Sequence, residues 1–268
     1  MSLKHEYFTS NPPEDYYPFF LEHRSIQGAL ENICEKWVAY LESHIELTGK
    51  LFNEPEIPWK HTERAIVSTL SAAISKGFPD SLVIEERDVV KTGNKNGKGR
   101  WDLWATIPEL KVASEQFSFY LEAKRSQTPK TTDTLLHYLN TDRGVSRIFN
   151  DYLKCAGEKI KKLSPYGKLG GRVHPHYVIG LLVMPLERNP KDPSDVRCYP
   201  GVDTILHDVF DNWHTIKTKS SSIPEIKRRL GRFPTAALIL EPQNGHTGMI
   251  AVFTVIGATQ ELLNKPNA

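Results

Sequence analysis

The sequence predicts an α/β fold in which a mixed central β-sheet is flanked by helices. Two regions near the N-terminus repeat apolar residues every three or four positions, which is typical of amphipathic helices. Several later segments instead alternate apolar and polar residues, or are apolar without a break, which indicates strands. The predicted order is two helices, three strands, a helix, a buried strand, a helix and two strands. This order favours helices packed on a mixed sheet.

The two N-terminal helices are predicted over residues 18–50 and from about residue 60 to residue 76. The first carries an apolar stripe, formed by Ile26, Leu30, Ile33, Trp37, Tyr40 and Leu41. Prolines separate the two helices, and Gly77 ends the second. Residues 1–18 are polar, aromatic and proline-containing, and we expect them to form an irregular arm.

The strands are predicted over residues 81–90, 100–107, 116–124, 177–184, 236–240 and 249–256. A basic, glycine-rich turn at residues 91–99 joins the first two strands, and a Pro-Gln-Asn-Gly turn joins the last two. The segment 177–184 is apolar throughout, so we expect a strand that is buried on both faces. Further helices are expected at about residues 133–163 and 203–217.

The composition is that of an ordinary soluble protein. The chain has 268 residues and a formal net charge of +2, and its aromatic and apolar contents exclude a disordered chain. No window approaches the ~20 apolar residues of a membrane helix, and no apolar signal segment opens the chain. Cys34, Cys155 and Cys198 lack metal-binding spacing, so we expect free thiols and a cytoplasmic protein. We expect an arm with a helical extension over residues 1–58 and an α/β domain over residues 59–268.

An acid-x-Lys triplet, Glu122-Ala-Lys124, ends the third predicted strand. The chain contains three such triplets, about as many as its composition gives by chance, so their context has to decide among them. The triplet that begins at Glu225 lies at a predicted helix start, where its charged side chains would diverge. The triplet that begins at Glu109 is expected in a turn. Only Glu122 and Lys124 share one face of an alternating strand.

The preceding strand carries Asp102 on the matching face. If the two strands form an antiparallel hairpin that turns near residues 111 and 112, opposite residues have numbers that sum to about 224. Asp102 then lies opposite Glu122. Facing carboxylates repel each other, and Mg²⁺, which typically takes one or two carboxylates together with waters and phosphate oxygens, removes that penalty. A lysine on the same face, Lys124, can orient or help to deprotonate the attacking water and can stabilise charge on the phosphate. The sequence therefore predicts metal-dependent hydrolysis of phosphodiester bonds.

Glu63 is a candidate third carboxylate. It lies in the first turn of the second helix, in line with the apolar stripe of that helix, so its side chain is expected to point towards the sheet. Two readings stay open at this point. Glu63 is either a further metal-site residue or a glutamate that stabilises the helix N-terminus or pairs with Lys60 or His61.

This order of elements resembles the core of the PD-(D/E)xK nuclease superfamily, which has the restriction-endonuclease-like fold. The resemblance covers about residues 60–185, although Trp101 stands before Asp102 in place of the family's proline. It implies that Asp102 and Glu122 hold Mg²⁺, with Mn²⁺ as an alternative, that Lys124 is catalytic and that Glu63 is an auxiliary metal ligand. The implied function is a nuclease, most simply a DNA endonuclease of restriction or defence type.

Basic and polar residues that flank the predicted site are candidates for contacting nucleic acid: Lys95, Lys98, Arg100, Arg125, Ser126, Gln127 and Lys130. DNA is the expected partner, RNA is a second option, and no membrane contact is expected. A homodimer would suit the cutting of both strands of a duplex, although nothing in the sequence shows one. Two alternatives remain: a non-catalytic module that keeps this fold to bind nucleic acid or protein, and an unrelated α/β protein in which Glu122 and Lys124 form a surface pair.

Overall fold

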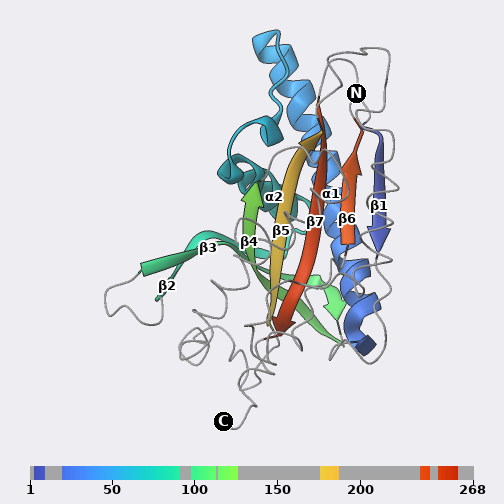
Figure 1. The fold of residues 1–268 in the computed structure, drawn as a ribbon, viewed down its shortest axis with the longest axis vertical. Coiled ribbons are helices and arrows are strands. Elements are labelled where there is room, and N and C mark those ends of the chain that lie inside the picture. Colours follow the sequence, from blue (N-terminus) through green and yellow to red (C-terminus); the bar gives the residue numbers. More distant parts are fainter. Residues whose placement is uncertain are drawn as a thin grey trace, which may run out of the picture.

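The fold is a seven-stranded mixed sheet with two helices on one of its faces, which confirms the predicted α/β class (Figure 1). The computed structural model describes residues 3–9, 20–90, 98–112, 114–125, 176–186, 236–241 and 247–258. The strands are β1 (His5–Thr9), β2 (Leu82–Val90), β3 (Lys98–Val112), β4 (Glu115–Arg125), β5 (His176–Leu186), β6 (Ala236–Leu240) and β7 (Gly248–Ala258).

The strands lie in the order β1-β6-β7-β5-β4-β3-β2. Within this sheet β4 and β5 are parallel, and the other neighbouring strands are antiparallel. Every described side chain of β5 is buried, as the unbroken apolar segment predicted. The helices predicted at residues 133–163 and 203–217 lie outside the described residues.

Both predicted N-terminal helices are present as α1 (Phe20–Phe52) and α2 (Glu63–Gly77), with a short 3₁₀ helix, η2 (Pro58–Lys60), between them. The indole of Trp37 in α1 donates a hydrogen bond of 3.0 Å to the hydroxyl of Thr69 in α2. A Cβ atom at Gly77 would lie 2.7 Å from Cγ of Lys36, so the glycine allows the end of α2 to approach α1 closely. Neither helix in the described part of the chain combines the length and the apolar character that crossing a membrane requires.

The N-terminal arm was expected to be irregular, and this is wrong for residues 5–9. These residues form the edge strand β1, which pairs antiparallel with β6. The strand is held from two sides, because the Tyr7 hydroxyl donates to the Gln27 carbonyl at 2.8 Å and Tyr7 and Phe8 pack against the core. Side chains from both predicted parts, residues 1–58 and 59–268, contribute to one hydrophobic core.

The hairpin of β3 and β4 has the predicted register along most of its length. Leu103 pairs with Leu121 and Ile107 with Phe117, so paired numbers sum to 224. The register then shifts between Ile107 and Lys111. Glu109 therefore lies within β3, and its predicted place in a turn is wrong. Proline at position 108 has no N–H to donate to a ladder, and Val112, only 1% exposed, returns the strand to the core before the hairpin turns.

Candidate active site

The structure brings the four predicted site residues together where β4 meets the start of α2. Lys124 Nζ lies 2.7 Å from Oε1 of Glu122, its neighbour on β4. The same nitrogen lies 3.4 Å from Oε1 of Glu63, the first residue of α2. Asp102 of β3 contacts β4 beside them, through the backbone N–H of Ala123. The prediction that these side chains share a site therefore agrees with the fold.

Asp102 marks the point at which β3 and β4 stop pairing. The last backbone pair on this side is Leu103 with Leu121, and the next step in the same register sets Asp102 against Glu122. There the Oδ2 atom of Asp102 accepts a hydrogen bond of 2.7 Å from the N–H of Ala123. A side-chain carboxylate thus serves as the acceptor for a backbone donor of β4. This contact holds Asp102 next to Glu122.

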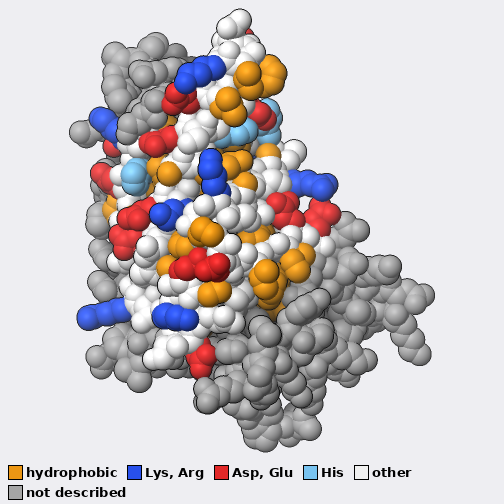
Figure 2. Space-filling model, turned by 180° about the vertical axis from the view of Figure 1, so that it is seen from behind, with side chains coloured by type: hydrophobic (Ala, Val, Ile, Leu, Met, Phe, Trp, Pro, Cys, Tyr) orange, Lys and Arg blue, Asp and Glu red, His pale blue; other side chains and the backbone are white. Residues whose placement is uncertain are grey.

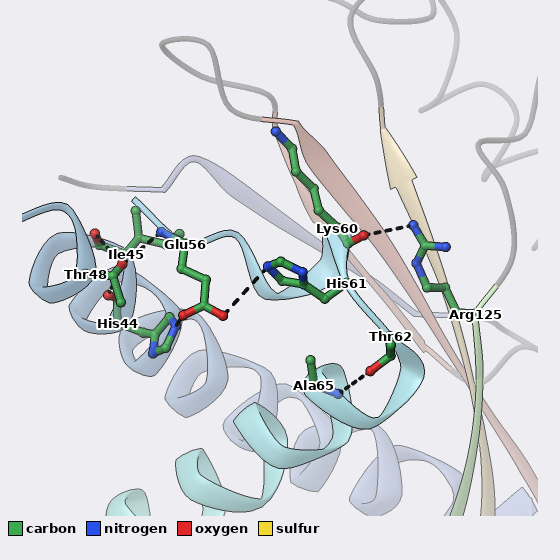
Figure 3. Close-up of polar contacts among 9 residues, drawn as sticks. All are labelled: His44, Ile45, Thr48, Glu56, Lys60, His61, Thr62, Ala65 and Arg125. Atoms are coloured by element: carbon green, nitrogen blue, oxygen red, sulfur yellow. Dashed lines mark hydrogen bonds and ion pairs between the residues drawn. The ribbon is translucent and has the colours of Figure 1, made fainter. Parts of the chain in front are cut away.

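Glu63 reaches the site because α2 begins directly in front of β4. Thr62 caps the helix, since its hydroxyl accepts a hydrogen bond of 3.3 Å from the N–H of Ala65 (Figure 3). Both carboxylate oxygens of Glu63 are engaged by β4: one faces Lys124, and the other accepts from the backbone N–H of Arg125 at 3.1 Å. Both carboxylate oxygens of Glu63 therefore contact β4, the strand that carries Glu122 and Lys124.

Burial dominates the electrostatics of the carboxylates. The pKa of Glu122 is raised to about 7, first by burial and then by the charge of Asp102, while Lys124 opposes the shift. Burial also raises the pKa of Asp102, although the Ala123 hydrogen bond and the charge of Lys124 oppose it. The surroundings of both carboxyl groups thus disfavour their ionised forms. A cation bound beside them would stabilise the ionised forms.

Lys124 is held in its charged form. Burial lowers its pKa, but the carboxylates of Glu122, Glu63 and Asp102 outweigh this effect, so the pKa lies above its usual value. The Lys124 side chain is only 14% exposed, and its ammonium also donates to the carbonyl of Ala123 at 2.6 Å. The three N–H groups of the ammonium are engaged by Glu122, Glu63 and Ala123, so Lys124 has to release one of these partners before it can donate to a water or a phosphate oxygen. In its charged form it has no lone pair with which to remove a proton. Of the roles predicted for Lys124, its charged state suits orienting the water and stabilising charge on the phosphate, and does not suit deprotonating the water.

The donor set suits a hard cation, but the carboxylates do not converge on one point. Among the residues that the structure describes, no group of three or more His, Cys, Asp or Glu side chains is arranged to hold a metal ion. The Lys124 ammonium contacts both Glu122 and Glu63 instead. Mg²⁺ usually needs only one or two carboxylates and keeps waters in its other positions. Asp102 and Glu122 are two partly buried oxygen donors on neighbouring strands and are the candidate ligands, with Glu63 as a candidate third.

Arg125 is the one predicted nucleic-acid contact whose side chain the structure describes. Its guanidinium donates to the backbone carbonyls of Trp59 and Lys60, as Figure 3 shows for Lys60. The backbones of Lys98 and Arg100 lie in β3, paired with β2. Lys95, Ser126, Gln127 and Lys130 lie outside the described residues. On the helical face, acidic and basic side chains are interspersed (Figure 2), so that view gives no reason to place a phosphate backbone there.

Sequence reasoning missed Glu86. In the register of β2 and β3, Glu85 pairs with Leu103 and Arg87 with Trp101, so Glu86 falls beside Asp102. Its charge contributes to the raised pKa of Asp102. Its carboxylate also lies 3.3 Å from Nη1 of Arg64 in α2. The sequence carried part of this signal: symmetric pairing about the turn at residues 91–99 sets residue 86 against residue 104, which places Glu86 on the same face as Asp102, two residues from its observed neighbour.

Comparison with known proteins identifies no relative. No protein-family model matches the chain, and neither a curated protein nor a solved structure matches it. The evidence on function therefore consists of the fold and the site.

Proposed function

We propose that this protein is a Mg²⁺-dependent nuclease, a hydrolase of phosphodiester bonds with a restriction-endonuclease-like core of the PD-(D/E)xK type. One observation carries the proposal. Asp102, Glu122 and Lys124 come together from two adjacent strands, and a helix that begins beside them adds Glu63. Burial is the main cause of the raised pKa values of Asp102 and Glu122. An ion pair that only stabilises the protein surface would not require its carboxylates to be buried in this way.

Each residue has a chemical role in this proposal. Asp102 and Glu122 hold the metal, with Glu63 as a further ligand. When bound, the metal supplies Lewis-acid polarisation of the scissile phosphate and lowers the pKa of a coordinated water. Lys124 donates hydrogen bonds to the phosphate oxygens and stabilises the charge that develops on them. Because its pKa is raised, we assign Lys124 to donation and not to the removal of a proton from the water.

We propose DNA as the substrate, cut internally by an endonuclease of restriction or defence type in the cytoplasm. Support comes from the basic residues that flank the site in the sequence, namely Lys95, Lys98 and Arg100 before it and Lys130 after it. RNA is the alternative substrate, and the same assay distinguishes the two.

The test is cleavage of supercoiled plasmid, duplex oligonucleotides and RNA by the purified full chain with Mg²⁺ or Mn²⁺. We expect Asp102→Asn, Glu122→Gln and Lys124→Ala each to reduce cleavage by at least about a hundredfold. A second Glu-x-Lys triplet provides matched controls, because Glu109 and Lys111 lie in β3 but outside the site. Glu109→Gln and Lys111→Ala should keep wild-type rates.

Two results would reject the proposal. One is full activity in the three site variants. The other is salt-dependent binding of nucleic acid with no cleavage under any metal, which would identify the chain as a binding module that keeps the fold.

A further inference from the structure

Arg125 contacts three groups that surround the start of α2. Its backbone N–H donates to Oε2 of Glu63 at 3.1 Å. Its Nε donates to the carbonyl of Trp59 at 3.3 Å, and its Nη2 to the carbonyl of Lys60 at 3.5 Å. One residue at the end of β4 therefore holds both the Glu63 carboxylate and the backbone turn that precedes it; Figure 3 shows the contact with Lys60 in this turn.

These carbonyls are suitable acceptors for an arginine. Trp59 and Lys60 are the last residues of η2, and the final carbonyls of a helix have no partners within the helix. The two hydrogen bonds internal to this turn use the carbonyls of Ile57 and Pro58. A guanidinium presents several donors in a fixed plane and can serve two neighbouring carbonyls at once, which a single ammonium does less well.

Trp59 anchors the same turn on its other side. Its side chain is 1% exposed, and its indole N–H donates to the carbonyl of Thr247, just before β7, at 3.0 Å. The turn is thus attached to β7 through Trp59 and to β4 through Arg125. Thr62 then caps α2, and Glu63 follows at once. The placement of η2 therefore sets where the Glu63 carboxylate lies relative to Lys124.

We infer that Arg125 is a positioning residue for the active site, which fixes η2 so that Glu63 reaches Lys124. The effect of Arg125 on catalysis rests on the proposed nuclease function, whereas its role in placing η2 is independent of that function. This role differs from the nucleic-acid contact predicted from the sequence. A phosphate contact needs a positive charge, whereas the placement of η2 needs donors that reach two carbonyls.

Arg125→Lys separates the two roles, because it keeps the charge and removes the fork of donors. In the full chain, we expect this variant to increase hydrogen–deuterium exchange in peptides that cover residues 58–66. We also expect Mg²⁺ and Mn²⁺, measured by calorimetry, to bind about tenfold more weakly or worse. The slope of duplex-DNA affinity against salt concentration, measured without divalent metal, should stay at the wild-type value. Arg64→Lys is the matched control, since Arg64 lies in the first turn of α2 and pairs with Glu86; exchange and metal affinity should not change.

Arg125→Gln removes the charge and keeps one amide that can donate, which provides a second variant with the same readouts. Positioning predicts increased exchange in both variants. Wild-type exchange and metal affinity in Arg125→Lys, together with a salt slope reduced by about one in Arg125→Gln, would overturn the inference in favour of a phosphate contact. If no variant and no wild-type protein binds metal, yet exchange still increases in both variants, the proposed nuclease function fails and the positioning role stands.

Discussion

The ammonium of Lys124 lies 2.7 Å from Oε1 of Glu122 and pairs with that carboxylate. The same ammonium contacts Glu63 at 3.4 Å. Under the proposed function, a cation held by Glu122 and Glu63 would compete with Lys124 for the same negative charge.

Removal of this competing charge should separate metal binding from cleavage. We expect Lys124→Ala to bind Mg²⁺ at least as tightly as the wild type, and about severalfold more tightly if competition dominates, while it loses cleavage. Calorimetric titration with Mg²⁺ and a plasmid assay on the same preparation measure the two effects. Lys111→Ala should leave both unchanged. Weaker metal binding in Lys124→Ala would show that the lysine organises the carboxylates and does not compete with the cation.

Stability without divalent metal should decrease as the pH rises. The pKa of Glu122 is raised from its ordinary 4.5 to about 7, so between these values the folded state binds more protons than the unfolded state. The free energy of unfolding then falls between pH 5 and pH 8, by on the order of 2 kcal/mol from this group, and Asp102 contributes in the same direction. Urea unfolding at both pH values measures the change. Glu122→Gln should flatten the dependence, whereas Glu109→Gln should retain it; an unchanged slope in Glu122→Gln would contradict the assignment.

Two substitutions at Asp102 should differ in stability but not in function. Asp102→Asn keeps an oxygen that can accept from the N–H of Ala123, whereas Asp102→Ala leaves that donor without its 2.7 Å partner. An unpaired buried N–H costs about 1–3 kcal/mol, so only the alanine variant should lose this much in chemical denaturation. Both variants should lose metal-dependent cleavage. Equal stability of the two would mean that the hydrogen bond contributes little to the sheet.

The contact between the helices allows a test of the fold that does not involve the site. Thr69→Val removes the hydroxyl that accepts from the buried indole of Trp37, so we expect a loss of about 1–2 kcal/mol in the free energy of unfolding. Ser43→Ala, at an exposed hydroxyl of α1, is the control and should change stability by less than about 0.5 kcal/mol. Cleavage by the Thr69→Val variant should stay at the wild-type rate under conditions where it is folded.

The site hairpin could be predicted because its signals are local. Alternation identified the faces of β3 and β4, and a hairpin turn assumed near residues 111 and 112 gave the pairing of Leu103 with Leu121, which sets Asp102 beside Glu122. The position of Glu63 followed from the helical stripe of α2.

Features that depend on distant partners could not be predicted in this way. The edge strand β1 exists because β6, more than 200 residues away, offers it a pairing edge. Arg125 was predicted to contact nucleic acid because the carbonyls that it actually contacts belong to a turn about 65 residues earlier in the chain, which the local sequence does not reveal. The register shift after Ile107 depends on where Val112 can re-enter the core, and alternation within one strand does not report this.

Under the proposed function, the hydrogen bond between Asp102 and Ala123 would favour one way of coordinating a cation over another. The oxygen Oδ2 serves as the final acceptor of the ladder between β3 and β4, and Oδ1 is then the natural donor to a cation. Asp102 is thereby suited to monodentate coordination. A metal at this site would keep more of its positions for water and substrate than a bidentate carboxylate would leave, and an enzyme that must bring both a nucleophile and a phosphate to one cation requires those open positions.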